Sequence, residues 1–318
     1  MNLIDMHCDT ISVLHEAGME KRLFSNDLEV DIQKMKNGHS KAQFFALFLH
    51  LESLIKKGIA PFEFVNDMLV RFNEEMELNR DFIRHAKNLQ DMEENEKQGL
   101  MSAFLTIEEG GALEGSIENL REIHSKGVSL ITLTWNFENE LGYPNCNPET
   151  MNKGLKERGI EFVEAMNEFN MLIDVSHLSD GGFYDVLKHS RKPFVASHSN
   201  ARSITNHPRN MTDDMIKALS NKGGVMGLNF CSAFLNEKDR VSRIEYMVEH
   251  LKHIRNIGGI DVMAMGTDFD GIGCELEMKN IGEMNKLVDA LQKANFTEND
   301  IEKIFHKNVE RVIGEVLR

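Results

Sequence analysis

Five apolar runs in this chain each end in residues that can bind a metal ion or transfer a proton. These residues are His7 and Asp9, the adjacent pair Glu108 and Glu109, and the single residues His177, His198 and Asp268. Side chains at the carboxyl ends of several different strands are the means by which a (β/α) barrel builds an active site. Histidines and carboxylates converging on one mouth suit a pair of divalent metal ions better than a single ion. The pattern therefore predicts a metal-dependent hydrolase.

The spacing of the histidines supports a role as ligands. His7 and Asp9 are two residues apart, so on a strand their side chains point to the same side while that of Cys8 points to the other. Two ligands can then reach one ion from a single strand. His177 and His198 end consecutive strands, and each follows a serine. One buried histidine is more often a hydrogen-bonded core residue, but two at equivalent positions on neighbouring strands are expected to be ligands.

The two glutamates offer one bridging carboxylate. Glu108 and Glu109 are adjacent and cannot both face the mouth. A carboxylate with two oxygens can bridge two metal ions about 3.5–4 Å apart. The local pattern does not choose between the two residues. The following Gly110-Gly111 favours Glu109, because the chain must turn sharply beside the ion there.

Two further choices stay open on the pattern alone. Asp268 could be a ligand, a general acid or base, or an anchor for a substrate amine, and Asp270 competes with it. Arg202 and Arg209 lie in the loop after the sixth strand. Either guanidinium could bind a planar carboxylate through two hydrogen bonds, or it could be an exposed charge at the start of a helix.

The elements that must position these residues alternate along the chain. Three further apolar runs, at 42–51, 128–134 and 223–230, bring the number of expected strands to eight. They lack clean alternation, as expected of strands buried on both faces. Helical periodicity is present between them, over 62–82, 116–125, 153–169, 180–189, 212–220 and 241–257. Eight alternations of strand and helix predict an α/β fold: a closed (β/α)8 TIM-type barrel with the metal site at the C-terminal face of its strands.

The chain shows no sign of division into domains. It has no linker of Ser and Gly, no Pro-rich stretch and no block of like charge, so we expect a single barrel domain over residues 1–318. The final stretch, 297–317, has the pattern of an amphipathic helix and is expected on the outside of the barrel.

The composition excludes several classes of partner. A net charge of −15 argues against nucleic acid and against anionic membrane surfaces, since both require basic patches. No stretch approaches the roughly 20 apolar residues of a membrane span, and the first residues do not resemble a signal peptide. The four cysteines are scattered without C-x-x-C spacing, which favours reduced thiols. These features predict a cytoplasmic enzyme.

Six motifs together resemble those of the renal (membrane) dipeptidase family, zinc peptidases of the metal-dependent hydrolase superfamily. They occur in the family's order from residue 5 onward: Asp5-Met6-His7-Cys8-Asp9, Glu109-Gly110-Gly111, Asp174-Val175-Ser176-His177, Ser197-His198-Ser199-Asn200-Ala201-Arg202, His207-Pro208-Arg209-Asn210 and Asp268-Phe269-Asp270-Gly271. The resemblance implies two Zn²⁺ ions, with other divalent metals as alternatives. It implies His7 and Asp9 on one ion, His177 and His198 on the other, and Glu109 as the bridge.

The resemblance also implies roles for residues that the pattern left open. Asp268 becomes the acid/base residue that also handles the substrate amine, and Arg209 the clamp for the substrate's terminal carboxylate. The implied substrates are dipeptides, with a D-residue tolerated at the second position. The family also tends to form homodimers.

The chain departs from the family's mammalian members after the fourth strand. Those members carry a histidine there that polarises the scissile carbonyl, whereas this chain has Trp135 and Asn136. The Leu-Thr-Trp-Asn pattern resembles the bacterial branch, and stabilisation of the oxyanion is expected from Trp135, Asn136 or a metal. The alternatives are hydrolysis of another small amide or lactone, and a metal-binding homologue without catalytic activity.

Overall fold

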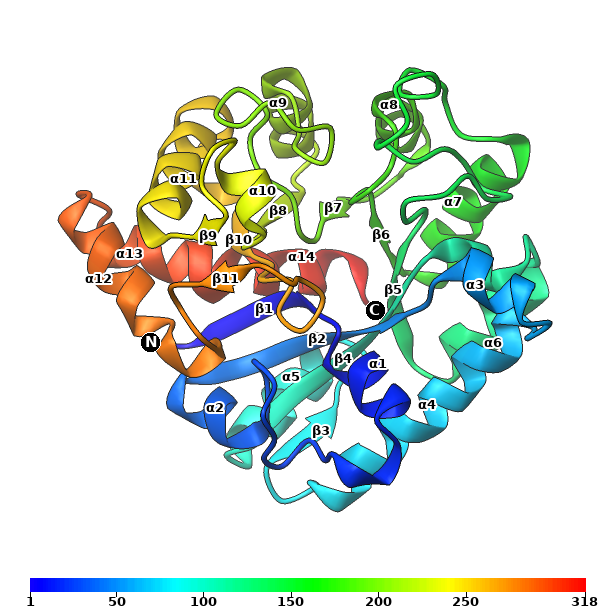
Figure 1. The fold of residues 1–318 in the computed structure, drawn as a ribbon, viewed down its shortest axis with the longest axis horizontal. Helices are drawn as coiled ribbons and strands as arrows, with labels where there is room; N and C mark the ends of the chain where they lie inside the picture. Colours follow the sequence, from blue (N-terminus) through cyan, green and yellow to red (C-terminus); the bar gives the residue numbers. More distant parts are fainter.

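The computed structural model describes residues 1–318 and contains a closed barrel of eight parallel strands (Figure 1). The barrel strands are β1 (Leu3–Cys8), β2 (Ser40–Phe48), β4 (Met101–Glu108), β5 (Val128–Thr132), β6 (Leu172–Asp174), β7 (Val195–Ala196), β8 (Val225–Leu228) and β10 (Met263–Met265). They follow one another around the barrel in chain order, and β10 pairs with β1 to close it. The predicted (β/α)8 fold and all eight expected strands are confirmed.

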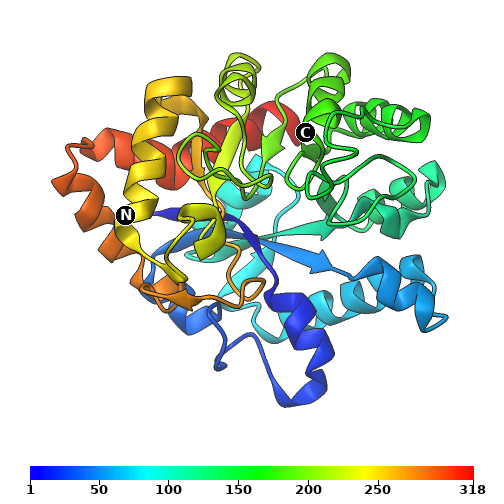
Figure 2. The same ribbon diagram turned by 45° about the horizontal axis from the view of Figure 1, so that its top comes forward.

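Helices surround the barrel, the green-to-yellow ones on one side and the blue ones on the opposite side (Figures 1 and 2). Their bounds are α1 (Thr10–Glu16), α2 (Ile32–Asn37), α3 (Leu51–Lys56), α4 (Pro61–Leu78), α5 (Leu89–Lys97), α6 (Ile117–Ser125), α7 (Glu157–Phe169), α8 (Asp180–His189), α9 (Asp213–Asn221), α10 (Ser232–Leu235), α11 (Ile244–Gly258), α12 (Asn285–Lys293), α13 (Glu298–Glu302) and α14 (Asn308–Val316). Ser116, Ser179 and Thr212 cap α6, α8 and α9 by accepting the third helical N–H. No helix is both long enough and apolar enough to cross a membrane.

Three short strands lie outside the expected pattern. Strand β3 (Ile83–His85) pairs with the beginning of β4. Strands β9 (Val241–Ser242) and β11 (Glu275–Leu276) pair with each other in a separate two-stranded sheet. The expected helix over 241–257 therefore begins three residues later, at Ile244, because its first residues are held in this sheet.

The interior of the barrel is filled by apolar side chains from all eight strands. They are Ile4, Met6, Ala42, Phe44, Phe104, Leu130, Leu172, Val195, Val225 and Ala264. The apolar face of α14, formed by Val309, Val312, Ile313 and Val316, belongs to the same buried group. The final helix therefore caps the amino-terminal end of the barrel, and the expectation that it covers the outside was wrong. An open barrel end exposes apolar side chains, and an amphipathic helix can bury them.

Candidate active site

Glu108, the last residue of β4, lies against three histidines at the carboxyl end of the barrel. Its Oε1 is 3.1 Å from His177 Nε2 and 3.3 Å from His198 Nε2, and its Oε2 is 3.3 Å from His7 Nε2. The histidines come from the ends of β1, β6 and β7, and all four side chains are buried. The structure thus brings the three predicted histidine ligands together around one carboxylate, both of whose oxygens face them.

Glu109, which the sequence analysis favoured, points elsewhere. Its Oε1 accepts hydrogen bonds from Gly111 N at 2.8 Å and Asn139 Nδ2 at 2.5 Å, and its Oε2 accepts one from Trp135 N at 3.1 Å. Glu109 has left the strand with φ +95°, and its carboxylate folds back over Gly111, where a Cβ would lie 2.7 Å from Oε1. The prediction of Glu109 over Glu108 is therefore corrected. Gly111 leaves room for the anchored carboxylate of Glu109, and the glycines do not mark a sharp turn beside an ion.

The donor set fits a divalent metal centre. His7 Nε2 and Asp9 Oδ1 are buried and have no hydrogen-bond partner, although such an atom costs about 1–3 kcal/mol when it is left unpaired. Asp9 Oδ2 is 3.5 Å from His7 Nε2, and Asp268 joins the same group of potential ligand atoms. Imidazole nitrogens together with carboxylate oxygens are ligands that Zn²⁺ accepts, and other divalent ions accept them too.

Neighbouring polar groups orient the two later histidines. His177 Nδ1 lies 2.9 Å from Asn136 Oδ1, and His198 Nδ1 lies 2.7 Å from Ser197 Oγ. Ser197 Oγ in turn donates to Asp174 Oδ2 at 2.5 Å. A partner at Nδ1 leaves Nε2 as the atom that faces Glu108, as in many metal sites.

The protonation of these two histidines also suits metal binding. Burial lowers the pKa of His177 to about 3, with a further contribution from the charge of Arg209. Burial also lowers the pKa of His198 well below its usual value. Both rings are therefore neutral near pH 7, which is the form that coordinates a metal.

Asp268 lies beside this cluster at the end of β10. Its Oδ1 is 3.8 Å from His7 Nε2, and its Oδ2 accepts a hydrogen bond from Asn229 Nδ2 at 2.8 Å. Burial raises the pKa of Asp268 to about 7. Asn229 follows β8 and was missed by the sequence analysis, although its position after an apolar run was a usable signal.

Asp270 is part of the scaffold of the same loop. Its Oδ2 accepts from Thr10 Oγ1 at 2.5 Å, and its Oδ1 accepts from Glu29 N at 2.7 Å. The next residue, Gly271, leaves no room for a side chain, because a Cβ would lie 2.0 Å from Asp9 Oδ2. Asp270 thus tethers the loop while Asp268 faces the cluster.

The two arginines of the loop after β7 have different surroundings. Arg202 donates two hydrogen bonds to Asp180, at 2.6 and 2.8 Å. Arg209 is buried, lies over the ring of Phe234 and donates from Nη2 to His198 O at 3.2 Å. Arg209 Nε and Nη1 have no partner. A buried guanidinium with two free donors beside a histidine of the cluster is suited to a carboxylate.

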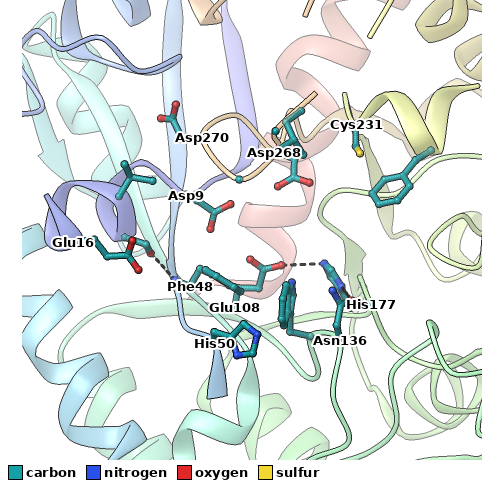
Figure 3. A pocket seen from close by; sticks show the side chains of 17 residues that line it. Asp9, Glu16, Phe48, His50, Glu108, Asn136, His177, Cys231, Asp268 and Asp270 are labelled. Carbon is teal, nitrogen blue, oxygen red and sulfur yellow. Dashed lines mark hydrogen bonds and ion pairs between the residues drawn. The ribbon is translucent and has the colours of Figure 1, made fainter. Parts of the chain in front are cut away.

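A cavity of about 500 Å³ opens over this cluster (Figure 3). Its charged lining residues are Asp9, Glu16, Glu108, Asp268 and Asp270, with no lysine or arginine among the lining residues. Trp135 and Asn136 form part of its wall, as does His50, which the sequence analysis did not identify as a site residue. His50 follows β2, so it too occupied the position after a strand that marked the other site residues.

Comparison with known proteins identifies the family. The sequence profile of the membrane dipeptidases, peptidase family M19, matches residues 1–318. The chain belongs to this family. It is accordingly a metal-dependent dipeptidase, as the resemblance of its motifs predicted.

Relatives of this M19 dipeptidase occur in bacteria and in yeast. An uncharacterised protein of Klebsiella pneumoniae from the pqqA 5′ region is 31% identical over 243 residues, which cover 74% of this chain and 89% of that protein. An uncharacterised dipeptidase of Schizosaccharomyces pombe is 29% identical over 332 residues, which cover 98% of this chain and 79% of that one.

The fold matches that of solved metallopeptidases. A metallopeptidase from Rhodobacter sphaeroides, solved with a phosphinate mimic of the dipeptide L-Ala-D-Ala, superposes with a TM-score of 0.91. The two chains are 22% identical, and the match covers 99% of each.

Proposed function

We propose that this M19 dipeptidase is a binuclear zinc enzyme that cleaves dipeptides with a free C-terminal carboxylate. In this proposal His7 and Asp9 would hold one ion, His177 and His198 would hold the other, and Glu108 would contribute its carboxylate to both. The support is the contact of Glu108 with all three histidines and the unpaired buried atoms His7 Nε2 and Asp9 Oδ1. Such ions would polarise the scissile carbonyl and lower the pKa of a water molecule.

The observation that carries the choice of substrate is Arg209. Its two free donors would bind the terminal carboxylate, and its hydrogen bond to the carbonyl of His198 supports a clamp beside a proposed metal ligand. Only a short segment of substrate can lie between the clamp and the cluster, so the scissile carbonyl would belong to the residue next to the C-terminal one. The carboxylate-rich cavity would receive the substrate's ammonium group.

Asp268 would act as the general acid and base. Asn229 holds Oδ2, which leaves Oδ1 on the side of His7 to accept a proton from the attacking water and to deliver it to the leaving amine. Trp135 and Asn136 would contact the substrate from the cavity wall. Since Asn136 Oδ1 is engaged with His177, its amide NH₂ is the group that remains for the substrate.

The proposal includes tolerance of a D-residue at the second position. With the carboxylate held by Arg209 and the carbonyl held at the cluster, the C-terminal side chain would project into the open mouth. The side chain of the N-terminal residue would point toward the barrel, and the amine of the same residue must also reach Asp268. The site would therefore accept only the L configuration at this residue. The L-Ala-D-Ala mimic in the Rhodobacter enzyme of the same fold supports this reading.

A dipeptide panel with zinc-loaded protein tests the proposal. We expect kcat/KM on L-Ala-L-Ala and L-Ala-D-Ala to exceed that on D-Ala-L-Ala and on C-terminally amidated L-Ala-L-Ala, with bound zinc near two equivalents. Full activity with one equivalent of zinc would contradict the binuclear centre. Equal rates on the amide and the free acid would contradict the clamp, and no cleavage of L-Ala-D-Ala would contradict the stereochemistry.

A further inference from the structure

Two cysteines far apart in the sequence meet at the edge of the cavity. Cys231 follows β8 and Cys274 lies in the loop after β10, and these two strands are hydrogen-bonded neighbours in the barrel. Cys274 Sγ accepts a hydrogen bond from Ser232 N at 3.4 Å, so it lies next to the backbone of Cys231. Cys274 Sγ also donates to Phe230 O at 4.0 Å, so this sulfur contacts the backbone on both sides of Cys231. Both are free and partly exposed, and Cys231 lines the cavity (Figure 3).

Each cysteine is connected to Asp268. Cys274 belongs to the loop that begins with Asp268 itself. Cys231 N donates to Asn229 Oδ1 at 2.7 Å, and the same amide side chain donates to Asp268 Oδ2 at 2.8 Å. One asparagine thus joins the backbone of Cys231 to the carboxylate of Asp268, and a shift of either loop would change the position of that carboxylate.

We propose that Cys231 and Cys274 form a redox modification site, in which a reversible disulfide between them displaces Asp268 and slows hydrolysis. Forming the bond requires the two sulfurs to come within about 2.05 Å of each other, so the two loops must approach each other. The effect on the rate rests on the proposed role of Asp268, whereas the cross-link itself depends only on the placement of the two thiols.

The oxidant is a peroxide that enters through the cavity. The Cys274 thiolate attacks one peroxide oxygen, the O–O bond breaks, and a sulfenic acid and hydroxide form; the hydroxide takes up the proton that the Cys274 thiol released and leaves as water. The sulfur of Cys231 then attacks the sulfenic sulfur, the S–S bond forms as the S–OH bond breaks, and the Cys231 thiol proton joins the departing hydroxide as a second water. Two thiols are oxidised to one disulfide while one hydrogen peroxide is reduced to two waters. Hydrogen bonds from Cys231 and then from Ser232 N lower the pKa of Cys274 to about 6, which favours Cys274 as the attacking thiolate.

The two remaining cysteines provide internal controls. Cys8 is buried, and Cys146 is exposed with its thiol donating to Asn136 O at 3.2 Å. Cys146 is therefore open to oxidants but has no second thiol to form a disulfide. If activity were lost through simple oxidation of an exposed thiol, substitution of Cys146 would prevent the loss and substitution within the Cys231–Cys274 pair would not.

The test oxidises the zinc-loaded enzyme with hydrogen peroxide and compares it with the reduced enzyme. We expect a mass loss of two hydrogens, a Cys231–Cys274 peptide in a non-reducing digest, unchanged zinc content, and a fall in kcat of at least about tenfold that dithiothreitol reverses. Cys274→Ser and Cys274→Ala should each lose the sensitivity to peroxide, measured as the ratio of oxidised to reduced kcat. Cys146→Ser should keep it.

Three results would overturn the proposal. They are the absence of the linked peptide after oxidation, an unchanged kcat in fully linked protein, and sensitivity of both Cys274 variants equal to that of the unchanged enzyme. If the reduced enzyme cleaves no dipeptide, the proposed function fails instead, and the digest still decides whether the thiol pair forms.

Discussion

Glu108 and Glu109 are adjacent at the end of β4, but their carboxylates have different surroundings and therefore different roles. Glu108 contacts three histidines, whereas both oxygens of Glu109 are occupied by Gly111, Asn139 and Trp135. Burial raises the pKa of Glu109 to about 7. Burial would also raise the pKa of Glu108, but the three histidines outweigh this effect and lower the pKa of Glu108 well below its usual range. Glu108 is thus the permanently charged member of the pair.

Exchanging each glutamate for glutamine should separate these tasks. We expect Glu108→Gln to lower bound zinc substantially, because a neutral amide is a poor bridge between two cations. Glu109→Gln should retain zinc and change the free energy of unfolding by no more than about 1–3 kcal/mol. Elemental analysis and chemical denaturation measure the two effects. Loss of zinc in Glu109→Gln with retention in Glu108→Gln would reverse the assignment.

Asp268 and Asp270 form a second informative pair. Asp268→Asn should lower kcat by at least the roughly 10²-fold expected when a general acid/base is lost, with zinc content nearly intact. Asp270→Asn is the matched control, since an amide can still bind Thr10 and the Glu29 N–H, and it should affect kcat much less. Steady-state kinetics with metal analysis of both variants tests this assignment, which comparable losses in the two would refute.

The two arginines permit a similar comparison. Removing the Arg209 side chain should cost about 2–5 kcal/mol in kcat/KM on free-acid dipeptides, the scale of a lost buried charge-assisted contact. Arg202→Ala is the control, because Arg202 is paired with Asp180. The measurement is kcat/KM for each variant on a free-acid dipeptide and its amide. A similar loss on both substrates would show that Arg209 does not recognise the carboxylate.

Among the helices, α14 covers the amino-terminal end of the barrel and closes its apolar interior. The α14 helix buries Val309, Val312, Ile313 and Val316 against the barrel interior. Its Glu310 accepts from Lys41 Nζ of β2 at 2.7 Å and lies 3.1 Å from His306 Nδ1, while Lys41 also contacts Glu96 of α5 at 2.8 Å. This network ties the helix to a barrel strand and to a neighbouring helix.

The network should make stability depend on pH. Burial alone would raise the pKa of Glu310, but hydrogen bonds from His306 and Lys41 outweigh it and lower the pKa from 4.5 to about 2. Because the pKa of Glu310 is lower in the folded than in the unfolded state, the ionised carboxylate stabilises the folded state above about pH 4.5. This contribution to the free energy of unfolding is lost as the pH falls toward 2. Glu310→Gln should therefore reduce the free energy of unfolding by about 2 kcal/mol at pH 7 and by progressively less below pH 4.5.

Denaturation of Glu310→Gln and the unchanged protein across this pH range measures the effect. Glu315→Gln is the control on the same helix, because Glu315 is half-exposed and its contact with Arg311 is 3.5 Å long. Its change should stay within about 0.5 kcal/mol. A destabilisation of Glu310→Gln that does not vary with pH would rule out the ionised contact as its cause.

At the scale of the whole molecule, the proposed metal centre joins distant parts of the chain. Its ligands come from the ends of β1, β4, β6 and β7, which span residues 7 to 198. An ion that binds only the folded arrangement stabilises the whole barrel by linkage. A metal bound there would therefore contribute to the stability of the mouth as well as to its chemistry.

Removing the metal should therefore destabilise the protein. Zinc at a thousandfold excess over its dissociation constant would contribute about 4 kcal/mol at 25 °C. We expect a chelated sample to unfold at a lower temperature than the zinc-loaded one in calorimetry, with zinc restoring the difference. Glu108→Gln should show a much smaller shift on adding zinc. Identical transitions with and without chelator would contradict a centre made from these four strand ends.

The pattern of residues along the chain is sufficient to predict the barrel and the position of the site within it. Eight apolar runs alternating with helical segments leave few arrangements other than a closed parallel barrel, and polar residues at their ends must then meet at one mouth. His7, His177, His198 and Asp268 are therefore expected near one another from the pattern alone. The same signal was available for His50 and Asn229, which also follow strands.

Which of two neighbouring residues at a strand end faces the site depends on the folded backbone and is not encoded in the pattern. Alternation defines the direction of a side chain within a strand, but it fails at the residue where the strand ends, because the backbone there is free to turn. Glu109 has φ +95° and folds back onto its own loop, so the carboxylate facing the histidines is Glu108. The position of α14 and the meeting of Cys231 with Cys274 likewise depend on contacts between residues remote in the chain, which periodicity along the sequence does not encode.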